Sequence, residues 1–95
     1  MSKIKLNNTE FEFDSYNKNT YYGGEAVSST ASCSLLNVDM ADLSDLAETT
    51  ITSIEIRNNE NTLVYDLKNI NAKIDNINEY YNGMSMAISV TMIFQ

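Results

Sequence analysis

Strict alternation of apolar and polar side chains runs through most of this chain of 95 residues. Successive side chains of a strand point to opposite faces, so a period of two predicts strands with one buried and one solvated face. We therefore expect a single mainly β domain over 1–95, an antiparallel β-sandwich or open barrel with one short helix. About seven strands are predicted, at 3–6, 9–13, 27–35, 50–56, 63–68, 70–81 and 84–94.

Asn7-Asn8 separates the first two alternating runs. With a two-residue loop, Leu6 faces Thr9 and Ile4 faces Phe11, which places the apolar side chains of both runs on one face. Asn also tolerates the positive φ that a type I′ turn requires. The sequence therefore predicts a tight hairpin at this position.

Asn82-Gly83 predicts a second hairpin. Uninterrupted pairing from this turn would place Ile74 on the wrong face, and one extra residue at Asp75-Asn76, a β-bulge, corrects it. The predicted pairs are Tyr81–Met84, Glu79–Met86 and Ile77–Ile88 before the bulge, then Ile74–Val90, Ala72–Met92 and Ile70–Phe94.

Residues 39–48 form the only helical pattern, with the helix expected near 40–48. Asp39 is a suitable N-cap and Asp42 occupies the N3 position. The apolar face would contain Met40, Leu43, Leu46 and Ala47. The acids Asp39, Asp42, Asp45 and Glu48 form either a solvated face, which we favour, or a patch for a cation or a basic partner.

The composition excludes much chemistry. The chain has no histidine and one cysteine, so Cys-His and Ser-His-Asp sites cannot form. Cys33 falls at an inward position without a base and is expected to be a buried thiol. We therefore expect no enzyme activity, no cofactor and no metal site.

The charge also limits the partners. Six basic residues, scattered singly, face 13 acidic ones, giving a net charge of −7. A surface that binds phosphates needs clustered Lys and Arg, so neither nucleic acid nor a membrane is an expected partner. No apolar run suggests a membrane span or signal peptide, and we expect synthesis in a reducing cytoplasm.

Tyrosines supply the candidate contact residues. Residues 15–25 are expected to form a loop containing Tyr16, Tyr21 and Tyr22, and Tyr80 and Tyr81 flank the Asn82-Gly83 turn. Tyrosine is enriched in protein interfaces because it buries a large area while losing few rotamers. The alternative for each is packing over the core.

Two strands also have alternative interpretations. The Ser/Thr-rich run 28–34 is either an edge that accepts another strand or an ordinary strand with a polar outer face. Met84, Met86 and Met92 are expected to fill the core, with an adaptable binding groove as the alternative.

Four stretches, which together span most of the chain, carry a resemblance to known proteins. They are Ile4-Lys-Leu-Asn-Asn-Thr-Glu-Phe-Glu-Phe, Ser15-Tyr-Asn-Lys-Asn-Thr, Leu46-Ala-Glu-Thr-Thr-Ile-Thr-Ser-Ile-Glu-Ile and Ile70-Asn-Ala-Lys-Ile-Asp-Asn-Ile-Asn-Glu-Tyr. These stretches resemble small proteins encoded in the structural-gene region of tailed phages of low-GC Gram-positive bacteria. The resemblance implies a virion component: a capsid decoration protein or a small tail or baseplate subunit. None of the stretches is a catalytic or ligand motif, so no functional residue is carried over.

Three functions therefore compete. The favoured one is a non-enzymatic virion protein, preferably a capsid decoration protein, that assembles in the host cytoplasm and contacts phage capsid or tail proteins and copies of itself. The second is an acidic inhibitor of a basic host defence protein, suggested by the net charge of −7. An enzyme is the third and the least supported.

Overall fold

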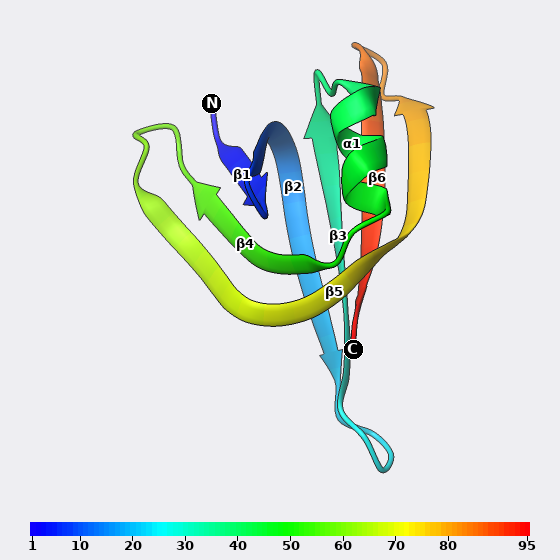
Figure 1. Ribbon diagram of the computed structural model, residues 1–95. Helices are drawn as coiled ribbons and strands as arrows, with labels where there is room; N and C mark the ends of the chain where they lie inside the picture. Colours follow the sequence, from blue (N-terminus) through cyan, green and yellow to red (C-terminus); the bar gives the residue numbers. More distant parts are fainter.

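Six strands and one helix make up the computed structural model, which describes residues 1–95 (Figure 1). The mainly β architecture with antiparallel pairing and one short helix is confirmed. The elements are β1 (Lys3–Leu6), β2 (Thr9–Tyr21), β3 (Ser28–Leu36), α1 (Met40–Ala47), β4 (Ile51–Arg57), β5 (Leu63–Tyr81) and β6 (Met86–Phe94).

The strands close into a ring in the order β1-β2-β3-β6-β5-β4, and β4 pairs with β1. Two strands are shared between the two sides of this ring. β2 pairs with β1 through Thr9–Glu12 and with β3 through most of its remaining length, while β5 pairs first with β4 and then with β6. The barrel therefore consists of a first sheet around β1 and β4 and a second sheet around β3 and β6.

Irregularities occur where the shared strands pass from one sheet to the other. The β2–β3 register shifts between Phe13 and Ser15, so that Asp14 is an extra residue. In β5 the register with β4 jumps between Lys68 and Ala72, and Asn69 has a positive φ of 57°. Bulges bend a strand and increase its twist, which lets it turn a corner between sheets.

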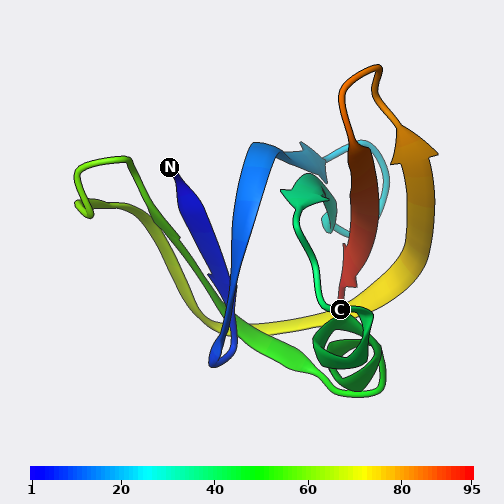
Figure 2. The same cartoon turned by 90° about the horizontal axis from the view of Figure 1, so that it is seen from above.

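The core lies between the two sheets, and α1 contributes to it from one side. Leu43 and Leu46 are the buried residues of the helix, whose first turn is capped by the Asp39 carboxylate accepting from the Ala41 N–H at 3.0 Å. Figure 2 shows β3 and β6 side by side, with the second half of β5 beyond β6. The largest fully buried side chains are Ile4, Leu6, Leu35, Leu43, Ile51, Ile54, Met92 and Val90.

The number and extent of the strands differ from the sequence prediction. The runs 63–68 and 70–81 form one strand, β5, because the irregularity at Asn69 bends the chain without ending its pairing. The predicted loop over 15–25 was also wrong up to Tyr21, because pairing with β3 extends β2 to that residue. Neither β3 nor β6 is an edge, since each pairs on both sides.

The two hairpin predictions had different outcomes. At the first hairpin, the pairs Leu6–Thr9 and Ile4–Phe11 are confirmed, although only Asn7 of the two loop residues has a positive φ. At the second, the bulge near Asp75 is confirmed, but the strands join through four residues and Tyr81 pairs with Met86. The register is therefore shifted by two residues from the predicted one.

This shift changes which side chains are buried. Met84 and Met86 are 91% and 59% exposed, so of the three methionines expected in the core only Met92 lies there.

Burial also differs from the sequence pattern in the helix and in β4. On the helix, Met40 and Ala47 are exposed. In β4, Ile51 is buried and Thr50 and Thr52 are exposed, because the register with β5 is irregular between Ile51 and Ser53.

Asn7 provides a test of how the barrel closes. Its backbone has a φ of 57°, its side-chain N–H donates to the Thr50 carbonyl at 3.0 Å, and its side-chain oxygen accepts from the Thr52 N–H at 2.8 Å. Asn7→Ala removes both bonds and strains the turn, so it should lower the free energy of unfolding by about 1–3 kcal/mol in urea denaturation. The exposed Asn8→Ala is the control, and an equal loss in both variants would contradict this role.

Candidate functional site

The five candidate tyrosines fall into two groups. Tyr16 and Tyr80 are half-buried and hydrogen-bonded: the hydroxyls of Tyr16 and Tyr65 are 3.1 Å apart, with their rings 5.2 Å apart, and the Tyr80 hydroxyl bonds that of Ser34. Burial, followed by the Tyr65 hydrogen bond, raises the pKa of Tyr16 far above its usual value. Tyr21, Tyr22 and Tyr81 are exposed. The structure therefore leaves three of the five available for contacts.

Tyr21 and Tyr22 lie at the tip of the β2–β3 hairpin and are 66% and 75% exposed. The Tyr21 ring lies so close to Gly23 that a Cβ at that position would collide with its hydroxyl end. Val27 on the returning chain is also exposed. No charged residue occurs from Asn19 to Gly24, so the tip presents aromatic and apolar surface, and the exposed Glu25 is the one charge in the loop.

Tyr81 belongs to a second apolar tip, formed by the β5–β6 turn with Met84 and Met86. The Asn82 side-chain oxygen accepts from the N–H groups of Met84 and Ser85, both at 3.0 Å, which fixes the turn. Beside this tip, between the start of α1 and the strands, is an open pocket of about 400 Å³. Its lining residues are Leu35, Asn37, Val38, Met40, Glu79, Ser85, Met86, Ala87 and Ile88.

The two tips project from opposite ends of the molecule, which measures 43 × 28 × 24 Å (Figure 1). The β2–β3 tip extends beyond the barrel at one end, and the β5–β6 turn lies at the other. A partner that contacts both tips must therefore span the length of the barrel.

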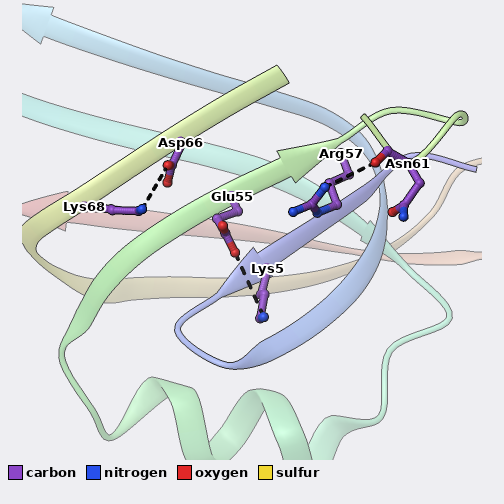
Figure 3. Close-up of polar contacts among 6 residues, drawn as sticks. All are labelled: Lys5, Glu55, Arg57, Asn61, Asp66 and Lys68. Carbon is purple, nitrogen blue, oxygen red and sulfur yellow. Dashed lines mark hydrogen bonds and ion pairs between the residues drawn. The ribbon is translucent and has the colours of Figure 1, made fainter. Parts of the chain in front are cut away.

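The outer face of the first sheet is charged, and many of its charges are paired within the chain (Figure 3). Lys5 lies 4.0 Å from Glu55, and Lys68 lies 3.4 Å from Asp66. The Arg57 guanidinium donates to the Asn61 carbonyl at 3.2 Å. Such exposed ion pairs contribute little to stability but leave few charges here without a neighbour of opposite sign.

The outer face of the second sheet differs sharply, since two complete cross-strand rows contain only Ser, Thr and Asn. Sequence reasoning recognised the Ser/Thr run of β3 but not this face, because the neighbours of β3 depend on the ring topology. The rows, which run from β2 across β3 and β6 to β5, are Ser15-Ser34-Ser89-Asn78 and Asn17-Ser32-Thr91-Asn76.

The helix carries the predicted acidic residues on its exposed side. Asp42, Asp45 and Glu48 are exposed and form no ion pair within the chain, while Asp39 serves as the N-cap. Acidic side chains near a helix N-terminus interact favourably with its dipole, which accounts for Asp42 in the first turn but not for Glu48 at the C-cap. The helix therefore presents a solvated acidic face.

Cys33 is buried in β3, 2% exposed, as the sequence predicted. Burial raises the pKa of its thiol from 9.0 to about 12, which disfavours the reactive thiolate. No group of three or more His, Cys, Asp or Glu side chains is placed to hold a metal ion. The chain also contains no helix with the length and apolar character to cross a membrane.

Comparison with known proteins gives no relative: no family model, curated protein or solved structure matches this chain.

The Cys33 thiol predicts a specific pH dependence of stability. Its folded-state pKa is raised, so its stabilising contribution is complete below pH 9.0 and is lost as pH rises toward 12. Cys33→Ala should cost at most about 1–2 kcal/mol at neutral pH and should flatten the loss of stability between pH 9.0 and 12.

Urea denaturation of both proteins across this pH range measures the effect. Parallel stability curves would contradict a buried thiol that titrates late.

Proposed function

We propose that this protein is a non-enzymatic structural protein of a tailed-phage virion and acts as a capsid decoration protein. The observation that carries the proposal is the placement of Tyr21, Tyr22 and Tyr81, which are all exposed, on hairpin tips at opposite ends of the barrel. Exposed aromatic side chains reduce solubility unless a partner covers them. The phage assignment itself is supported by the sequence resemblance.

The surface chemistry is consistent with assembly by shape and hydrogen bonding. The charges of the first sheet are largely paired within the chain, whereas the second sheet carries rows of hydroxyl and amide groups, in which only the Ser34 hydroxyl is buried and bonded by Tyr80. A decoration protein needs contacts that repeat over a symmetric shell rather than a catalytic cleft. A small tail or baseplate subunit requires the same features and is the alternative within this class.

An acidic inhibitor of a basic host defence protein is the second candidate function. It is favoured by Asp42, Asp45 and Glu48, which lie exposed and unpaired on one helix of a chain with a net charge of −7. Binding of this kind would depend on long-range charge attraction and would weaken steeply with salt. The two candidates therefore place the contact at different elements, the hairpin tips or α1.

Mass spectrometry of purified particles, with copy-number estimation, tests the virion proposal directly. A decoration protein should be present in hundreds of copies, whereas a connector or baseplate subunit would be present in roughly 3 to 12, following the symmetry of those assemblies. Absence from the particles would refute the virion proposal.

Two double variants separate the hairpin tips from the helix. Tyr21→Ser with Tyr22→Ser should reduce occupancy on particles, because interface hot spots contribute about 2 kcal/mol or more each. The melting temperature should stay within a few degrees, because both rings are exposed. Particle binding and thermal unfolding are measured on the same preparations.

The matched variant is Asp42→Asn with Asp45→Asn, which neutralises α1 and should bind particles normally. Normal binding by the tyrosine variant combined with failure of the aspartate variant would overturn the proposed contact surface. That result would instead support the acidic inhibitor.

A further inference from the structure

Although the ring is closed, the second sheet keeps two unpaired edges. From Ser15 to Tyr21, β2 pairs with β3 only, because the first residue of β1, Lys3, already lies opposite Glu12. From Asn76 to Tyr81, β5 pairs with β6 only, because β4 pairs with the earlier part of β5. Both segments are regular, without Gly, Pro or a bulge. An unpaired edge of this length is a template for another strand.

The two edges run in opposite directions. The second sheet has four strands, all antiparallel to their neighbours, so the β2 edge is antiparallel to the β5 edge. A second copy placed beside the first in the same orientation therefore brings its β5 edge antiparallel to the first copy's β2 edge. No reversal of the sheet is required for the hydrogen-bonded ladder to continue.

Charge opposes the pairing of either edge with itself in particular registers. Two β2 edges centred on Lys18 would place these lysines opposite each other. Two β5 edges centred on Ile77 would place Asp75 opposite Glu79. Like charges directly opposite each other destabilise a strand pair, and no self-pairing of either edge places Lys18 opposite an acidic residue, whereas pairing of β2 with β5 can.

Pairing of a β2 edge with a β5 edge brings opposite charges together and places side chains of the same sheet face opposite each other. With Lys18 opposite Glu79, every inward side chain of one edge meets an inward side chain of the other. Neither Lys18 nor Glu79 forms an ion pair within its own chain. The Lys18 amine instead lies 5.2 Å from the Phe94 ring, folded over the inner face. The six pairs in this register are Tyr16–Tyr81, Asn17–Tyr80, Lys18–Glu79, Asn19–Asn78, Thr20–Ile77 and Tyr21–Asn76.

We propose that the β2 edge (Tyr16–Tyr21) of one copy pairs antiparallel with the β5 edge (Asn76–Tyr81) of a second copy, with Lys18 opposite Glu79. This contact is heterologous, so its repetition produces a ring or a filament rather than a closed dimer. It extends the Ser/Thr/Asn face of the second sheet across successive copies. The inference deepens the proposed structural role by naming the self-contact, and it rests on that role for its biological purpose.

Charge exchange tests the contact in the purified full-length protein. The wild-type protein should self-associate in a concentration series measured by analytical ultracentrifugation. Lys18→Glu and Glu79→Lys should each weaken association roughly three- to tenfold, because a cross-strand attraction becomes a repulsion. The combination of both substitutions should restore association toward the wild-type level.

Two controls separate the contact from general effects. Glu60→Lys makes the same change in net charge as Glu79→Lys at an exposed turn away from both edges, and should not weaken association. Glu79→Lys leaves the Lys18–Phe94 contact within the chain in place, so its melting temperature should remain near that of the wild type. A wild-type protein that stays monomeric, or a combined variant that is not restored, would overturn the proposal.

Cysteine pairing tests the register. In a Cys33→Ala background, Asn19→Cys with Asn78→Cys should give a ladder of covalent oligomers under oxidation, because these residues face each other between copies. Asn19→Cys alone should give none. Covalent dimers from this single variant would show that β2 edges meet each other and would overturn the heterologous contact.

The proposed function and this self-contact can fail separately. Protein bound to particles without charge-dependent self-association would retain the virion role and refute the edge contact. Conversely, a ladder from the cysteine pair in a protein absent from particles would support the contact and refute the virion role.

Discussion

The barrel depends on two strands that each pair with different neighbours along their length. β1 has four residues and can satisfy only the beginning of β2, and β4 likewise pairs with only part of β5. The rest of each long strand pairs with β3 or β6 in the second sheet. Extra residues at Asp14 and around Asn69 let the two strands turn between the sheets. Most of their backbone N–H and C=O groups can therefore form hydrogen bonds with neighbouring strands that enclose a single core.

The same arrangement explains why the closed ring still has edges. Where β2 and β5 pass into the second sheet, neither strand pairs any longer with its neighbour in the first sheet. One side of each backbone is therefore unpaired there. The two Ser/Thr/Asn rows and the exposed aromatic tips belong to this second sheet and its hairpins. The first sheet, by contrast, has charged side chains largely paired with one another (Figure 3). The surfaces proposed for self-contact and partner contact therefore lie on one half of the barrel.

The sequence indicated tyrosine as the residue type of the candidate contact surfaces, but it did not indicate which of the five tyrosines are exposed. Tyrosines in polar segments beside glycines indicated contact surfaces, and Tyr21, Tyr22 and Tyr81 are indeed exposed. Tyr16 has the same sequence character, yet its ring packs on Tyr65, which lies 49 residues further along the chain. No local pattern distinguishes these cases, because the difference depends on which distant strand lies nearby.

The sequence by itself determined the strand character, the first hairpin, the capped helix, the buried Cys33 and the bulge near Asp75, because each depends on neighbouring side chains or on one local turn. Only the tertiary structure decided the extension of β2 to Tyr21, the fusion of two runs into β5 and the exposure of Met84 and Met86. Those outcomes depend on hydrogen bonds to strands distant in the sequence, and local periodicity carries no information about which strands become neighbours.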